Sequence, residues 1–153
     1  MPSFDHNYAE ELLRRLLNHS NSCADSQNAC GSVAHHFYLT LQYSRGLGPT
    51  LPDSSTWLSR SIIKPLVLSR ILPVVEIFGP NTPFAIEQNS NGKTYLSCLA
   101  KELEVYLSLV QADELVPVPH PKLGPFEIDD WARWHVAHFE YHLKQLFRAT
   151  ATS

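Results

Sequence analysis

Apolar residues recur at the spacing of an α-helix in four separate stretches of the chain. Each stretch carries a stripe of apolar side chains along one side and polar residues elsewhere, which is the pattern of helices that pack together. No alternating strand pattern of useful length lies between them. The sequence therefore predicts an all-α fold, a four-helix bundle with short extra helices between the second and third long ones. The long helices are expected at 5–19, 29–45, 89–112 and from about Glu127 onward.

Polar residues mark where three of these helices should begin. Asp5 is a candidate N-cap for the first helix, and Asn89 or Ser90 for the third, because a side-chain oxygen there can accept a hydrogen bond from a free backbone N–H. Asp129 and Asp130 favour the first turn of the last helix through its dipole. These positions set the expected helix boundaries.

The connections between the helices differ in character. The polar run at 18–28 predicts a loop, and residues 47–87 predict short helices that Pro65 interrupts. The segment 79–92, GPNTPFAIEQNSNG, has the composition of an exposed loop and is expected to shape the rim of a pocket. Four prolines and one glycine at 115–126 exclude a continuing helix and predict an extended approach to the last one.

Length and charge narrow the classes of function. The 153 residues, 44% of them hydrophobic, suit one domain that covers 1–153. The formal net charge is −3 and the longest basic run is the pair Arg14-Arg15, so we expect no nucleic-acid or anionic membrane partner. The N-terminal residues lack the pattern of a secretory signal, and charges and prolines break the apolar-rich stretch 61–78. A soluble, cytoplasmic protein is expected.

The cysteines offer no recognisable site. Cys23, Cys30 and Cys98 are odd in number, and their spacings match no C-x-x-C metal or redox pair. Cys23 and Cys30 could pair as a disulfide, but the reduced state is the default in a cytosolic chain. We interpret all three as ordinary thiols.

The last predicted helix carries histidines on the side where its core residues should lie. In the run WARWHVAHFEYHLKQL, His135, His138 and His142 share one stripe, because each helical residue advances about 100° around the axis. Trp131 and Phe139 lie on the same stripe. The histidines are therefore expected to face the interior.

Buried histidines at this spacing suggest a metal site. His138 and His142 form an H-x-x-x-H pair, which places two imidazoles one turn apart and close enough to bind one ion. His36 in the second helix shares a face with Thr40 and supplies a third ligand, whereas His35 points about 100° away. The alternative is a set of core histidines that are hydrogen-bonded to neighbours. Each buried nitrogen left unpaired costs about 1–3 kcal/mol, which favours an ion that uses them all.

Two stretches of the chain resemble a known family. The run HPKLGPFEIDDWARWHVAHFEYHLKQL is similar to a signature in which a His-Pro, a Gly, a Trp and H-x-x-x-H-x-x-Q recur in that order. In VAHHFYLTLQYSRGL a histidine is followed seven and eight residues later by Tyr and Ser. Both patterns resemble an uncharacterised branch of the DinB/YfiT-like superfamily, whose members are regarded as metalloenzymes. The resemblance spans most of the chain.

The resemblance implies a four-helix bundle with up-down-down-up connectivity and a divalent metal site at His36, His138 and His142. Members of the wider superfamily use zinc or nickel and often dimerise. They include thiol-dependent S-transferases and a hydrolase of small thiol-bearing metabolites. One departure concerns the pocket wall, because a Trp-Gly-like element of the family reads Ala29-Cys30-Gly31 here.

Four further residues are candidates for proton transfer or for orienting a ligand, since a metal-bound imidazole usually donates its other nitrogen to a partner. They are His120, His135, Tyr43 and Gln145. Each also has a structural interpretation. His120 could be a loop residue held by prolines, His135 a core histidine bonded to a backbone carbonyl, and the other two plain helix packing.

The pattern leaves three functions open. Three neutral histidines would leave the ion its full +2 charge and open coordination positions, which suits a transferase or hydrolase of a small thiol or amide substrate. A non-catalytic ion that stabilises the fold or a dimer is the second function, and a metal-free bundle used for protein interaction is the third. A deep polar pocket beside the ion would favour the first, and a site sealed by side chains the second.

Overall fold

The chain is described by a computed structural model that covers residues 3–22, 26–47, 51–77 and 92–151. Its regular structure there is entirely helical, apart from one isolated β-bridge, which confirms the predicted all-α class. None of the described helices is both long and apolar enough to cross a bilayer. The helices are α1 (His6–Ser22), α2 (Ser26–Ser44), the π-helical turn η1 (Ser59–Ile63), α3 (Lys64–Leu68), α4 (Gly92–Gln111) and α5 (Ile128–Ala151).

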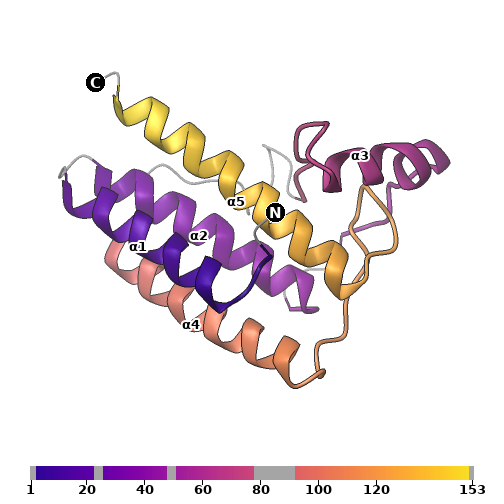
Figure 1. Cartoon of the computed structure of the whole chain (residues 1–153), viewed down its shortest axis with the longest axis horizontal. Coiled ribbons are helices and arrows are strands. Elements are labelled where there is room, and N and C mark those ends of the chain that lie inside the picture. Colours follow the sequence, from indigo (N-terminus) through magenta and orange to yellow (C-terminus); the bar gives the residue numbers. More distant parts are fainter. Residues whose placement is uncertain (1–2, 23–25, 48–50, 78–91, 152–153) are drawn as a thin grey trace.

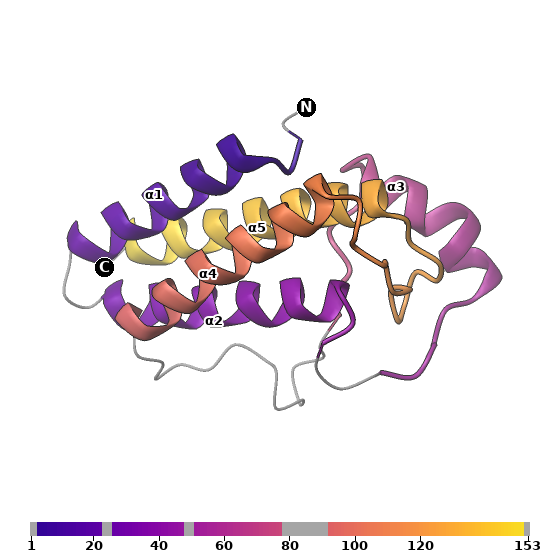
Figure 2. The ribbon, with the colours of Figure 1, turned by 90° about the horizontal axis from the view of Figure 1, so that it is seen from below.

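The four long helices lie side by side, and we call α1, α2, α4 and α5 the bundle (Figure 1). Helix α2 contacts each of the other three, and its contact with α4 is the most extensive. The short helix α3 lies beside one end of α5, outside the bundle, in both views (Figure 2). A side chain on the inner face of α2 can therefore reach α5.

Two apolar clusters meet along α5. The bundle core includes Phe37 of α2 and Phe139 of α5, whose ring centroids are 4.1 Å apart. The second, the end cluster, gathers Trp131 and Trp134 of α5 with apolar side chains from the end of α2, from α3 and from the loops beside it. His138 lies where the two clusters meet, with its ring 4.4 Å from Trp134 and 5.8 Å from Phe37. Large side chains buried in this way contribute about 1.5–3 kcal/mol each.

The helix boundaries match the predictions in part. Asp5 caps α1 as expected, because its Oδ1 accepts a hydrogen bond of 2.9 Å from the Tyr8 N–H. The prediction of a loop at 18–28 is wrong for the described residues of that run, which are helical. Ser20 is buried there, and packing of a helix against its neighbours outweighs the weak intrinsic preferences of short polar residues.

Short helices do occur within 47–87, but Pro65 does not end one. The helical path continues from Trp57 to Leu68, and the π turn of η1 ends at Ile63, two residues before the proline. A wider turn accommodates the ring that would clash with the carbonyl four residues earlier in a regular α-helix. The expected pocket rim at 79–92 and the caps Asn89 and Ser90 fall outside the described residues, except for Gly92, where α4 begins.

The extended approach to α5 is confirmed. His120 and Gly124 exchange two backbone hydrogen bonds of 2.9 Å across an isolated antiparallel bridge. Gly124 has a φ of +85°, and a Cβ there would lie 2.5 Å from the Cγ of Arg60. A glycine is therefore required at this turn. The bridge holds His120 at a fixed position beside the end cluster.

Candidate metal centre

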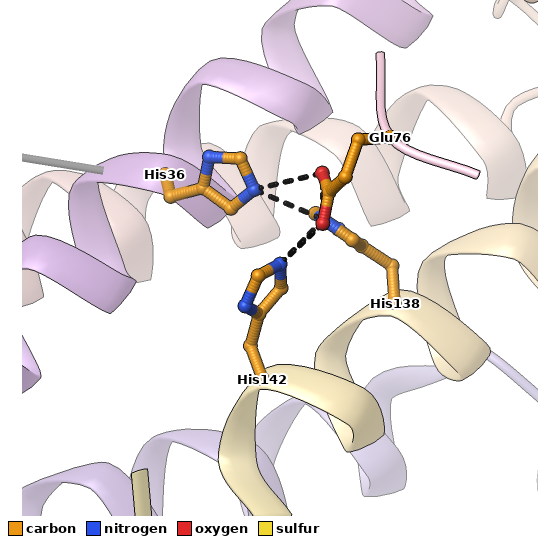
Figure 3. Close-up of side chains that lie close together, drawn as sticks. All are labelled: His36, Glu76, His138 and His142. Atoms are coloured by element: carbon orange, nitrogen blue, oxygen red, sulfur yellow. Dashed lines mark hydrogen bonds and ion pairs between the residues drawn. The ribbon is translucent and has the colours of Figure 1, made fainter. Parts of the chain in front are cut away.

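Three histidines from two helices converge inside the protein (Figure 3). His36 comes from α2, and His138 and His142 come from successive turns of α5. Their exposed fractions are 3%, 0% and 7%. The Nε2 atom of His138 lies 3.0 Å from that of His36 and 3.1 Å from that of His142. His35 faces elsewhere, with its ring 4.2 Å from Tyr95 of α4, as the helical geometry predicts.

A carboxylate that the helical pattern of the sequence does not predict completes the group. Glu76 follows α3 and directs its side chain at the histidines (Figure 3). One oxygen, Oε2, lies 2.9 Å from His138 Nε2 and 3.2 Å from His36 Nε2, and Oε1 lies 2.6 Å from His142 Nε2. The four ligand atoms all lie within 4.8 Å of one another.

Hydrogen bonds among the four side chains do not by themselves account for this arrangement. A ring nitrogen of neutral histidine has either one proton or one lone pair, yet His138 Nε2 faces two other imidazole nitrogens and a carboxylate oxygen. A divalent ion would accept a lone pair from every ring. Zinc–nitrogen bonds of about 2.0–2.1 Å in a tetrahedron separate the ligand nitrogens by about 3.3 Å. The observed separations of 3.0 and 3.1 Å are close to this value.

Two of these rings have a second nitrogen, Nδ1, whose burial without a partner costs free energy. Nδ1 of His36 and Nδ1 of His138 are buried, and neither has a hydrogen-bond partner among the described residues. If Nε2 binds an ion, Nδ1 carries the proton, and such a donor usually has an acceptor in metal proteins. Each unpaired N–H costs about 1–3 kcal/mol. Bonds to an ion at Nε2 would offset this cost.

Burial and charge give two of these residues the protonation states that metal ligands need. Burial alone would raise the pKa of Glu76, but hydrogen bonds from the three histidines hold it well below its usual range. The carboxylate is therefore ionised. Burial lowers the pKa of His138 to about 3, even though Glu76 acts in the opposite direction. His138 is therefore neutral near pH 7, with a lone pair to offer.

Glu76 makes the net charge of the site differ from the charge expected from the sequence. Three neutral histidines would leave a bound ion its full +2 charge, whereas one carboxylate beside them reduces the net charge to +1. The side chain of Glu76 is 29% exposed, so this ligand lies on the side of the group that solvent reaches. The available signal was an acidic residue inside the apolar run PVVEIF, in a segment without helical periodicity.

His120 lies outside the group of four. It is fully buried, and its Nδ1 accepts hydrogen bonds of 3.1 and 3.2 Å from the backbone N–H groups of Lys122 and Leu123. Its Nε2 donates to the carbonyl of Val75 at 3.2 Å. Both ring nitrogens are engaged by backbone groups, one of them in the residue that precedes Glu76. This arrangement gives no direct support to its expected role in proton transfer.

His135 is a core residue on the same helix as two of the ligands. Its Nε2 donates to the hydroxyl of Ser44 at 3.0 Å, and that hydroxyl donates to the carbonyl of Leu41 at 2.7 Å. The expected partner, a backbone carbonyl, is therefore replaced by a side-chain oxygen. Its ring stacks on Trp131 and Phe139, and burial lowers its pKa well below the usual value. It does not belong to the group of four.

Tyr43 and Gln145, the other two candidates, contact residues outside the group of four. Tyr43 packs in the end cluster near Trp131, and burial raises its pKa. Gln145 is exposed on α5 and donates a hydrogen bond of 3.0 Å to the hydroxyl of Tyr141. Helix packing describes the position of Tyr43, and a surface hydrogen bond that of Gln145.

The described cysteines do not contribute to the site. Cys30 is buried in the bundle core as a free thiol, and burial raises its pKa to about 11. Cys98 is a partly exposed free thiol on α4, and Cys23 lies outside the described residues. A thiol with a raised pKa is a poor nucleophile and a poor ligand.

Comparison with models of protein families finds no match, and comparisons with curated proteins and with solved structures find none either. The assignment of function therefore depends on the geometry of the four residues and on the sequence resemblance.

Proposed function

We propose that the protein is a divalent-metal-dependent enzyme, a transferase or hydrolase that acts on a small thiol-bearing substrate. The ligands are His36, His138, His142 and Glu76. The observation that carries this proposal is the convergence of three imidazole nitrogens and a carboxylate within 4.8 Å, on largely buried side chains. The thiol substrate comes from the sequence resemblance alone.

The same proposal includes a DinB/YfiT-like fold with up-down-down-up connectivity. The colours in Figure 1 support it, because α2 and α4 run from one end of the bundle to the other while α1 and α5 run back. The positions of His36 on α2 and of the H-x-x-x-H pair on α5 support it as well.

Zinc is the metal that suits these ligands best, and nickel is the second choice. Imidazole nitrogen with one carboxylate oxygen is a common zinc ligand set, although imidazole also binds nickel. When bound, the ion would act as a Lewis acid and lower the pKa of a thiol or water beside it. The partly exposed carboxylate of Glu76 can orient a substrate at that edge.

One feature favours a second function, a non-catalytic metal-binding bundle in which the ion stabilises the fold or a homodimer. Four protein ligands around one zinc ion are typical of closed structural sites, whereas catalytic sites keep three and leave a position open. Glu76 supplies such a fourth ligand. The two functions therefore differ in whether an outside ligand can reach the ion.

Addition of a small thiol to the cobalt-loaded protein distinguishes these functions. In the proposed enzyme the thiolate binds the ion, and a thiolate-to-cobalt charge-transfer band grows to saturation in the absorption spectrum. The control is the variant that carries both His138→Leu and His142→Ala, which should give no band because two of the four ligands are lost and cobalt is not retained. A cobalt spectrum of the parent that stays unchanged at saturating thiol would reject the thiol-dependent enzyme in favour of the closed site.

A further inference from the structure

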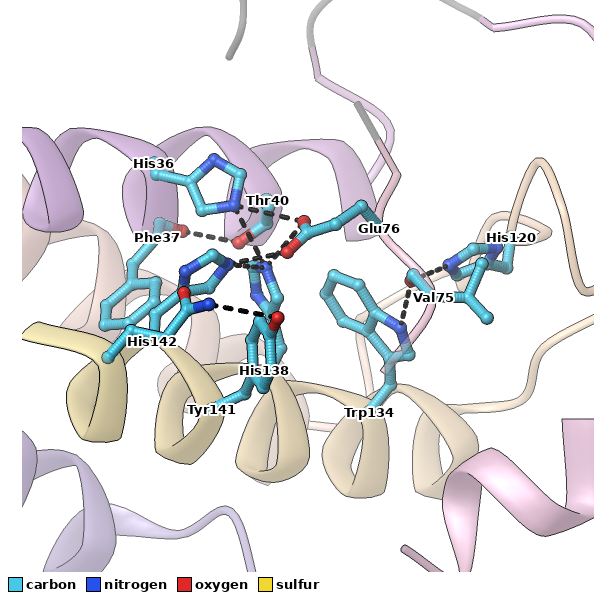
Figure 4. Close-up of polar contacts among 11 residues, drawn as sticks. His36, Phe37, Thr40, Val75, Glu76, His120, Trp134, His138, Tyr141 and His142 are labelled. Atoms are coloured by element: carbon cyan, nitrogen blue, oxygen red, sulfur yellow. Dashed lines mark hydrogen bonds and ion pairs between the residues drawn. The ribbon is translucent and has the colours of Figure 1, made fainter. Parts of the chain in front are cut away.

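One backbone carbonyl receives two buried donors beside the metal centre (Figure 4). The Nε2 atom of His120 donates to the oxygen of Val75 at 3.2 Å, and Nε1 of Trp134 donates to the same oxygen at 3.0 Å. Both side chains have no exposed surface. A carbonyl oxygen has two lone pairs, so these two donors satisfy it fully.

The direction of the His120 hydrogen bond follows from its other nitrogen. Nδ1 accepts from the backbone N–H groups of Lys122 and Leu123, so the single proton of the neutral ring resides on Nε2. The β-bridge to Gly124 fixes the backbone of His120 in turn. His120 is therefore a rigid donor with only one available direction.

Val75 immediately precedes Glu76, the ligand that no helix presents. Residues 73–77 belong to neither a helix nor a strand, so their backbone has no regular ladder of hydrogen bonds to fix it. The Val75 carbonyl and the Glu76 N–H share one planar peptide group. Fixing this carbonyl therefore fixes the start of the ligand residue.

We infer that Trp134 and His120 are positioning residues, which hold the Val75 carbonyl and thereby aim the Glu76 carboxylate at the metal. This inference rests on the proposed metal site. Hydrogen-bond partners outside the ligand shell typically change metal affinity by about 10- to 100-fold when they are removed. Loss of the Trp134 donor is expected to have an effect of this size.

Trp131 provides a matched control on the same helix. It is as buried as Trp134, belongs to the same end cluster, and donates from Nε1 to the carbonyl of Val118 at 2.7 Å. Val118 lies in a segment without a ligand. Replacement by phenylalanine keeps an aromatic ring at either position and removes one N–H donor.

The experiment measures the cobalt affinity and the cobalt d–d spectrum of the parent, Trp134→Phe and Trp131→Phe proteins. The inference predicts cobalt binding about 10- to 100-fold weaker with an altered spectrum in Trp134→Phe, and binding within about 3-fold of the parent in Trp131→Phe. Circular dichroism is used to check that both variants keep the helical fold.

A second comparison distinguishes an effect of Trp134 through Glu76 from an effect through His138. The ring of Trp134 also stacks on His138 at 4.4 Å, and this contact alone could alter metal binding. The Trp134→Phe substitution is therefore repeated in Glu76→Ala protein. If Trp134 acts through Glu76, the substitution has no further effect on cobalt affinity there. An effect that persists in full identifies His138 as its route and overturns the inference.

The remaining outcomes are also distinct. Parent protein that binds no cobalt overturns the proposed metal site and this inference with it. Parent protein that binds cobalt, with both tryptophan variants alike, overturns the inference alone. If Trp134→Phe does not fold, His120→Gln, which keeps a donor, is compared with His120→Leu, which does not. Only His120→Leu should then weaken cobalt binding, and equal binding in both contradicts the inference.

Discussion

The His138→Leu variant is expected to bind divalent metal more than about 100-fold more weakly than the parent, because loss of even a hydrogen-bond partner of a ligand costs up to about this much. His138 has no exposed surface, and its Nε2 lies within 3.1 Å of the other three ligand residues. Leucine fills a similar volume but offers no lone pair. Competition with a chromophoric chelator measures the affinity for zinc or cobalt.

The His135→Leu variant is the matched control for this prediction. His135 is equally buried on the same helix, yet its Nε2 is bonded to Ser44 and not directed at the site. The control should keep the affinity of the parent to within about 10-fold, the lower end of the effects seen outside the ligand shell. Equal losses in both variants would show that the histidines act through general packing, and not as a metal site.

Acidification is expected to destabilise the metal-free protein through its buried neutral histidines. Burial lowers the pKa of His120 to about 3, whereas the unfolded chain has a histidine pKa of about 6.5. The unfolded state therefore binds the proton first as the pH falls. The stability that His120 provides is present above about pH 6.5 and is lost progressively down to about pH 3.

Between about pH 7 and about pH 4.5, His120 alone should reduce the free energy of unfolding by about 2–3 kcal/mol. His135 acts in the same direction, because its pKa is also lowered by burial. Urea denaturation at the two pH values, with a chelator present, measures the change. The His120→Gln variant cannot titrate and should show a smaller loss. An identical pH dependence in both proteins would disprove the expected role of His120.

Helical periodicity is sufficient to predict the histidine part of the site. His138 and His142 are one turn apart, and the apolar residues around them indicate which side faces inward. The same reasoning selects His36 over His35, and the structure places His36 Nε2 3.0 Å from His138 Nε2. These relations lie within single helices, where sequence spacing determines direction.

Residues outside the helices do not follow from spacing. Glu76 reaches the site because its loop folds back over α5, and the partners that fix this path, His120 and Trp134, are distant in the sequence. Tyr43 and Gln145 are predicted as candidates because a metal-bound imidazole usually donates its other nitrogen to a partner. Tyr43 packs in the end cluster, a tertiary contact that no local pattern encodes. Gln145 is bonded to Tyr141, one turn earlier on the same helix.

The most direct test of the metal centre is X-ray absorption at the zinc edge, on protein purified without a histidine tag and reconstituted with one equivalent of zinc. The proposed site predicts one zinc ion per chain, with nitrogen and oxygen ligands at about 2.0–2.1 Å and outer-shell scattering from three imidazole rings. Protein that retains no zinc, or zinc without imidazole scattering, would contradict a centre built from His36, His138, His142 and Glu76.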